Sequence, residues 1–144
     1  MLQREGEIRN PSGCAVTGVI DRSGKKMTGE SMIEAIAVMH DRSNGLGGGF
    51  AGYGTYPHYK DFYAFHLFYE TQKAQEETEA FIKRHFEIVY ASEIQTRKTP
   101  AVKGEPLIYR YFLAPLPRKL ANSRLPEREY VARCVIRING EVEG

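Results

Sequence analysis

The sequence predicts an α+β fold, and three observations lead to this prediction. A β-branched apolar stretch at residues 14–20 is followed by a helical apolar stripe at residues 31–40. A glycine-rich stretch at residues 41–54 follows, where glycine is too dense for a regular helix or strand. Residues 62–138 then show strand, helix, strand, strand and helix patterns, which is the order of a split βαβ unit without its final strand.

The composition excludes several classes of protein. The chain has 144 residues, of which 42% are apolar and 26% charged, as is ordinary for a soluble globular domain. A net charge of +2 is too small to indicate binding to nucleic acid or to an acidic membrane surface. No run approaches the roughly 20 apolar residues of a membrane helix, and Cys14 and Cys134 cannot build a disulfide framework. We therefore expect a cytoplasmic protein.

Residues 1–13 are expected to be a leader or propeptide. They read MLQREGEIRNPSG, which is polar throughout and lacks the apolar region of a secretory signal. The turn-forming residues Asn10-Pro11-Ser12-Gly13 end this segment directly before Cys14.

The remaining elements follow from periodicity and breaker residues. Residues 14–20 (CAVTGVI) suit a buried strand, and the stripe of the helix at 31–40 consists of Met32, Ile33, Ile36 and Met39. We expect further strands at 62–69, 87–91 and 107–114, and further helices at 71–85 and from near Pro126 to the stop signal Asn139-Gly140. A boundary near residue 60 would separate residues 14–60 from residues 61–144.

Cys14 is the first candidate for chemistry. A cysteine at the start of a strand is usually a small buried hydrophobic residue. Its position after a removable leader favours a second interpretation. If cleavage follows Gly13, the new α-amino group, with a pKa of about 7.7–8.0, can accept the proton of a thiol whose pKa is about 8.5. Cys14 would then be an activated nucleophile.

The order of these features resembles a known family. Gly13-Cys14-Ala15-Val16, a helix ending in Met39-His40-Asp41-Arg42, and Gly45-Leu46-Gly47-Gly48-Gly49 resemble the start of class II glutamine amidotransferases, and among them the amidotransferase portion of archaeal-type glutamate synthase. The resemblance extends loosely over residues 10–144. It implies an N-terminal-nucleophile fold, a four-layer αββα sandwich begun by the Cys14 strand. Residues 61–144 would be a ferredoxin-like insertion, incomplete at the C-terminus.

The resemblance also implies an activity. Cys14 would be the catalytic nucleophile and Arg42 would lie in the loop near the L-glutamine pocket. The enzyme would hydrolyse the glutamine amide through a cysteinyl thioester, without metal or cofactor, and pass ammonia to a synthase subunit. The sequence departs from the family at Ala15, where many members have glycine, and at Asp41, which separates His40 from Arg42. The family's substrate-binding arginine and Asn-Gly oxyanion hole lie further along the chain. We therefore expect residues 1–144 alone to be weakly active or inactive, and the remainder of the amidotransferase domain or a partner to complete the site.

Other interpretations remain open from the residues themselves. Residues 61–144 could form a non-catalytic ferredoxin-like interaction or regulatory module. Gly47-x-Gly49-x-x-Gly52 matches a dinucleotide fingerprint by letter, but no helix follows it to face a phosphate. The four histidines lack the spacing of a metal site. His66 and Cys134 are expected in the core.

Overall fold

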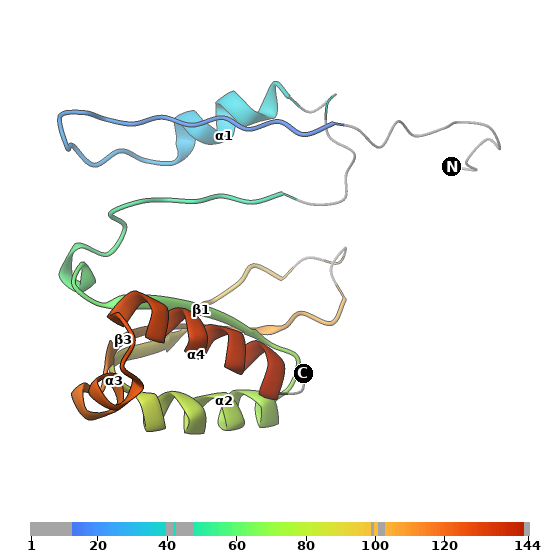
Figure 1. The fold of residues 1–144 in the computed structure, drawn as a ribbon. Coiled ribbons are helices and arrows are strands. Elements are labelled where there is room, and N and C mark those ends of the chain that lie inside the picture. The colour runs from blue at the N-terminus through green and yellow to red at the C-terminus, as the bar shows by residue number, and fades with distance from the viewer. Residues whose placement is uncertain (1–12, 40–41, 43–47, 99, 101–102, 143–144) are drawn as a thin grey trace. The chain divides into compact units, whose positions relative to one another are not determined.

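The computed structural model describes residues 13–39, 42, 48–98, 100 and 103–142 (Figure 1). Residues 1–12 of the predicted leader at 1–13, and residues His40, Asp41 and 43–47, lie outside the described residues. The chain divides into two compact units, residues 1–53 and residues 54–144, which we call the first and the second unit.

The described residues of the first unit contain one α-helix, α1, at Glu30–Ala37. The helix overlaps the predicted range of 31–40, but it begins one residue earlier and ends three residues earlier. The predicted strand at 14–20 is wrong: residues 13–20 form neither helix nor strand, and the side chain of Val16 is 92% exposed. A strand needs a neighbour to pair its backbone groups, and the described residues of this unit contain no strand.

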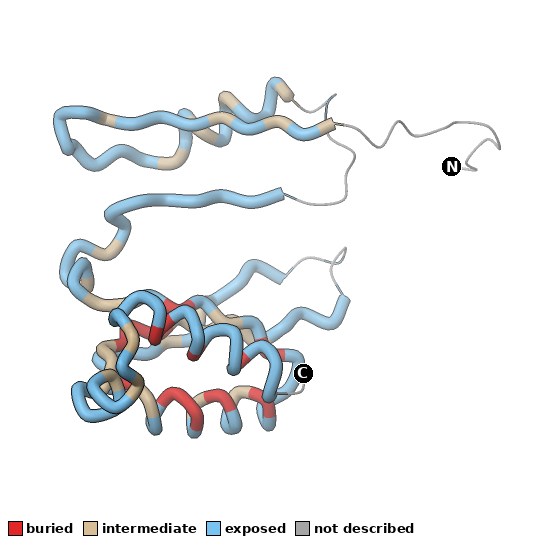
Figure 2. The backbone as a smooth tube through the Cα atoms, in the orientation of Figure 1, coloured by how far each residue is buried: buried red, intermediate tan, exposed pale blue. Residues whose placement is uncertain are grey.

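No described residue of the first unit is buried (Figure 2). The apolar stripe of α1 is present, but its members stay open to solvent, with Ile33 61% and Ile36 38% exposed. Phe50, 67% exposed, lies over the backbone of Gly29, where an added Cβ would come within 3.0 Å of its ring. This unit therefore presents apolar side chains without a closed core of its own.

The second unit is a small α+β domain, which confirms the predicted fold class at this level. A short 3-10 helix, η2 (Pro57–Tyr59), precedes the strands. The elements then follow as β1 (Tyr63–Tyr69), α2 (Gln72–His85), β2 (Phe86–Glu93), β3 (Leu107–Pro115), α3 (Pro117–Ser123) and α4 (Glu127–Glu141). Apart from α3, this is the predicted order of strand, helix, strand, strand and helix.

The three strands form an antiparallel sheet in the order β1-β3-β2. Because β3 runs antiparallel to both neighbours, β1 and β2 are parallel to each other on either side of it, as in a split βαβ unit. The register of β2 shifts between Ile88 and Tyr90, so Val89 is the extra residue of a β-bulge. Ile88 pairs with Leu113, whereas Tyr90 pairs with Phe112, whose side chain faces the other side of the sheet.

Helices α2 and α4 cover one face of this sheet and close the core (Figures 1 and 2). Thr71 caps α2, its hydroxyl accepting a hydrogen bond from the Ala74 amide at 3.1 Å. Each fully buried large side chain in such a core contributes about 1.5–3 kcal/mol. The fully buried or nearly buried core residues include Phe81, Ile82, Phe86, Tyr111, Leu113, Tyr130, Cys134 and Ile138.

Four details differ from the sequence predictions. Helix α3 is not among the predicted elements, because the prolines at 115 and 117 predict only the end of a strand. Asn139-Gly140 does not stop α4, which continues to Glu141, where Arg137 donates two hydrogen bonds to the Glu141 carboxylate. Pro126 is the N-cap of α4 rather than a residue of its first turn. His66 is exposed and points away from the helices, so its predicted place in the core is wrong.

Candidate functional site

The two residues predicted for the amidotransferase site, Cys14 and Arg42, lie in the first unit, and the structure brings Gly13, the neighbour of Cys14, against the Arg42 backbone. A Cβ added to Gly13 would overlap the carbonyl oxygen of Arg42 and lie 3.0 Å from its carbonyl carbon. The Gly13–Cys14 junction therefore packs directly against Arg42, although Gly13 and Arg42 are 29 positions apart in the sequence. Only glycine fits this approach without a shift of backbone atoms.

Local hydrogen bonds position Arg42 at the end of the α1 region. The Arg42 amide donates to the carbonyl of Met39 at 2.9 Å, and the Met39 amide donates to Ile36 at 3.0 Å. These tight turns return the chain after α1 to the segment that begins at Gly13. The contact between them is therefore built from backbone, while the side chain of Arg42 stays exposed.

Cys14 has the accessibility that a nucleophile needs. Its thiol is free and exposed, whereas Cys134 is free and buried at 2% exposure. Burial raises the pKa of the Cys134 thiol, while a hydrogen bond with Tyr130 and the nearby Arg137 act in the opposite direction. Cys134 is therefore a core residue, as predicted, and reagents in solution reach only Cys14.

Two polar clusters in the second unit are buried or half-buried, and neither was predicted. The Tyr69 hydroxyl donates to the Tyr111 hydroxyl at 3.2 Å, which donates to Glu79 Oε1 at 3.1 Å. Burial tends to raise the pKa of Glu79, but hydrogen bonds from Lys83, Tyr111 and Gln75 together lower it. This network connects α2 to the sheet, and the Glu79 carboxylate accepts hydrogen bonds from all three donors. We therefore interpret the network as structural.

The second cluster surrounds His85 at the end of α2. His85 Nδ1 lies 2.8 Å from the Tyr130 hydroxyl, and its ring stacks on Phe81 with centroids 4.4 Å apart. Burial and the positive charges of Arg137, Lys119 and Arg84 lower the pKa of His85, and Glu141 opposes them. Burial, assisted by Cys134, raises the pKa of Tyr130 to about 12. At neutral pH the pair is therefore uncharged and holds α2 against α4.

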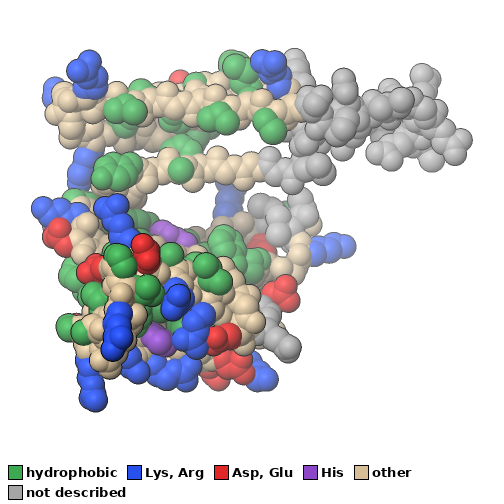
Figure 3. Space-filling model, viewed as in Figure 1, with side chains coloured by type: hydrophobic (Ala, Val, Ile, Leu, Met, Phe, Trp, Pro, Cys, Tyr) green, Lys and Arg blue, Asp and Glu red, His purple; other side chains and the backbone are tan. Residues whose placement is uncertain are grey.

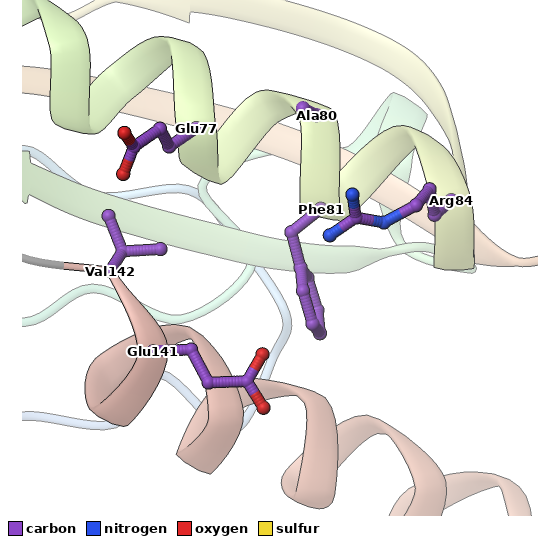
Figure 4. A pocket seen from close by; sticks show the side chains of 6 residues that line it. All are labelled: Glu77, Ala80, Phe81, Arg84, Glu141 and Val142. Carbon is purple, nitrogen blue, oxygen red and sulfur yellow. The ribbon is translucent and has the colours of Figure 1, made fainter.

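A shallow hollow lies between α2 and the end of α4 (Figure 4). Its volume is about 240 Å³, and it is lined by Glu77, Ala80, Phe81, Arg84, Glu141 and Val142. Neither Cys14 nor Arg42 lines it. Its charged lining consists of two carboxylates and one guanidinium.

Arg110 is a further polar group of the sheet that was not predicted from the sequence. It lies at the centre of β3, paired across the sheet with His66 on β1 and Ser92 on β2. Its Nη1 donates to the Tyr56 hydroxyl at 2.6 Å and its Nη2 donates to Ser92 Oγ at 3.2 Å, while its Nε is buried without a partner. The signal in the sequence was a lone charge within the apolar run LIYRYFLA.

Within the described residues, no group of three or more His, Cys, Asp or Glu side chains could hold a metal ion. Among those same parts of the chain, no helix has the length and apolar character needed to span a membrane. Acidic and basic side chains are intermixed over the visible surface of the second unit (Figure 3).

Comparisons with known proteins give one informative relative. The chain is 40% identical over 136 residues to a protein of Archaeoglobus fulgidus that is described as uncharacterized. The match covers 93% of this chain but 36% of the relative, so the chain spans about a third of the length of that protein. No family model matches the sequence, and no solved structure matches it. The chain is thus similar to the corresponding third of a longer archaeal protein.

Proposed function

We propose that the chain is the amino-terminal part of a cytoplasmic class II glutamine amidotransferase domain, with Cys14 as its nucleophile. The observation that supports this most is the packing of Gly13, in the chain before cleavage, against the Arg42 carbonyl. It joins the Gly-Cys junction to the segment after α1, and the family resemblance puts the nucleophile Cys14 at the first of these and Arg42, near the glutamine pocket, in the second. The exposed, free thiol of Cys14 also suits the proposal.

The proposed chemistry starts with removal of residues 1–13. The freed α-amino group of Cys14 accepts the thiol proton, and the thiolate attacks the side-chain amide carbon of L-glutamine. The C–N bond breaks, ammonia leaves with a proton from the α-ammonium group, and a γ-glutamyl thioester remains. Water then attacks this thioester, the carbon–sulfur bond breaks, and glutamate and the thiol are released. The ammonia passes to a synthase such as glutamate synthase.

The oxyanion of the tetrahedral intermediate needs donors that we expect from the remainder of the domain or from a partner polypeptide. One such donor is worth about 2.7–4 kcal/mol of the barrier, roughly 10²–10³ in kcat. The longer A. fulgidus relative is compatible with additional residues of this kind, since about two thirds of it lies outside the match. The open apolar side chains of the first unit fit a core that such residues complete.

Ammonia release from glutamine tests the proposal in the chain assembled with the polypeptide that completes the site. Cys14→Ala should abolish glutamine hydrolysis, whereas Cys134→Ala should retain it, because Cys134 lies in the core of the second unit. Equal hydrolysis by the Cys14→Ala variant and the unaltered protein would rule out Cys14 as the nucleophile.

A non-catalytic interaction module is the second candidate, and one observation favours it. All buried residues of the described chain lie in the second unit, which contains neither Cys14 nor Arg42. A domain with its own core and an open sheet can act as a binding module without chemistry. Retention of residues 1–13 together with ordinary thiol reactivity of Cys14 would favour this function over the first.

A further inference from the structure

The sheet of the second unit has one face turned away from α2 and α4, and its side chains follow from the strand register. Three cross-strand rows occupy this face: Ala64–Phe112–Tyr90, His66–Arg110–Ser92 and Phe68–Ile108. Residues directly opposite on neighbouring strands share a face of the sheet. We call this surface, with Arg110 at its centre, the Arg110 face.

Aromatic side chains close one end of this face and leave the other end open. Tyr59 stacks on Phe112 with centroids 4.1 Å apart, and Tyr56 meets the same ring edge-on at 5.1 Å. These contacts bury Phe112 to 2% exposure. At the other end of the face Phe68 is 66% exposed. Tyr90, in the same row as Phe112, lies beside Tyr59 with ring centroids 5.5 Å apart and is still 42% exposed.

Arg110 is a cation held among neutral groups. Its guanidinium carbon lies 4.5 Å from the centroid of the Tyr56 ring and 5.9 Å from that of Phe112. None of the ion pairs among the described residues includes Arg110; they are Lys73–Glu77, Lys83–Glu79 and Arg137–Glu141. An arginine is always protonated, so its charge is here partly desolvated and has no counter-ion within the described part of the chain.

The groups around Arg110 are matched to a carboxylate. Tyr56 and Ser92 use oxygen lone pairs to accept hydrogen bonds from the guanidinium, which leaves their own hydroxyl protons free to be donated. A guanidinium edge beside two hydroxyl donors is a site for an oxygen acid, and the planar fork of arginine suits a carboxylate. No Lys or second Arg stands in the three rows, which disfavours a polyanion such as nucleic acid.

We propose that the Arg110 face docks a partner polypeptide that presents an aspartate or glutamate side chain between apolar residues. The carboxylate pairs with Arg110, and the flanking apolar residues cover Phe68 and Tyr90. Arginine and aromatic residues are the types enriched at the centres of protein interfaces, where a few of them supply most of the affinity. The inference does not depend on Cys14 being a nucleophile, because every residue in it belongs to the second unit.

NMR of the ¹⁵N-labelled 144-residue chain tests the proposal with a blocked peptide, acetyl-Ser-Phe-Glu-Phe-Ser-amide, as probe. We expect saturable shifts of the Arg110 Nε–H and of the Tyr90 amide. The matched peptide with Gln in place of Glu should bind at least tenfold more weakly, because it replaces the charged acceptor with a neutral amide. This comparison requires no variant of the protein.

Variants of the chain then show which residue causes the preference for the Glu peptide. Arg110→Lys should bind the Glu peptide several-fold more weakly, and Arg110→Met should lose the difference between the two peptides. Arg128→Met is the matched control, since Arg128 is exposed on α4, and it should behave as the unaltered chain.

Four results would overturn the proposal: equal binding of the Glu and Gln peptides, no saturable shift, shifts on another surface, or the same shifts at comparable affinity with inorganic phosphate. Shifts of the Arg110 face on raising the protein concentration without peptide would also contradict it, and would identify a second copy of the chain as the occupant.

Discussion

Gly13 packs against the backbone carbonyl of Arg42 so closely that a methyl group at Gly13 has no room. Since neither partner in this contact is a side chain, the fit depends on glycine and on the turn after α1. The contact belongs to the chain before cleavage, since the proposed cleavage removes Gly13, and it places the start of the mature chain at Cys14 near the turn after α1.

Gly13→Ala should loosen this contact. The added Cβ must displace the Arg42 carbonyl, and overpacking of this kind costs about 1–3 kcal/mol. We expect faster hydrogen exchange at the Arg42 amide, which donates to Met39 in the same turn. Gly18→Ala is the control, because nothing lies within 4 Å of a Cβ at Gly18. Unchanged exchange in Gly13→Ala would show that the two segments are not packed together in solution.

The two cysteines should differ sharply in alkylation. In the native chain iodoacetamide should modify Cys14 alone, because Cys14 is exposed and Cys134 is 2% exposed in the helix-covered core. Denaturant should allow modification of both. Peptide mass mapping gives the sites, and a native chain modified at Cys134 as fast as at Cys14 would contradict the core of the second unit.

Stability should fall as the pH drops below about 6.5, the pKa of histidine in an unfolded chain. The pKa of His85 is lowered in the folded protein, so the unfolded chain binds more protons in the window below 6.5 and is favoured there. Above 6.5 this stabilising contribution is complete, and it is lost as the pH falls through the folded pKa.

Urea unfolding at pH 8, 7, 6 and 5 measures this dependence. His85→Gln should flatten the change between pH 7 and 5, while His58→Gln, at an exposed position, should keep it. An unaltered slope in His85→Gln would assign the effect to other groups.

The second unit could be predicted from sequence because its elements carry strong local signals. Residues 62–69 and 107–114 are apolar on both alternating faces, and Thr71 marks the start of α2 with a side-chain cap. These signals depend only on period and capping. They placed every strand of the sheet within two residues of its observed bounds.

The Arg110 face could not be predicted in the same way. Simple alternation puts Ile88, Tyr90 and Ser92 on one side of β2, but the bulge at Val89 moves the last two to the opposite face. The local sequence EIVYA at residues 87–91 contains no residue type that predicts a bulge. The exposure of His66 has a different cause, because packing between distant segments decides which face of the sheet α2 and α4 cover.

The predicted strand at 14–20 failed for a related reason. Its β-branched composition is a real preference, but a strand forms only when a neighbour supplies hydrogen bonds and a face to pack on. Helix α1 shows the same limit, because its stripe is formed while no residue of it is buried. An apolar pattern predicts which residues tend to be buried. It does not predict whether the described residues include the segments that would pack against them.

The most direct test of the central claim is the intact mass of the chain, assembled with the polypeptide that completes the site and treated with a diazo-ketone analogue of glutamine. The proposal predicts a chain that begins at Cys14 and carries one adduct on that residue, absent from the Cys14→Ala variant. A chain that keeps residues 1–13 and is never labelled at Cys14 would contradict it.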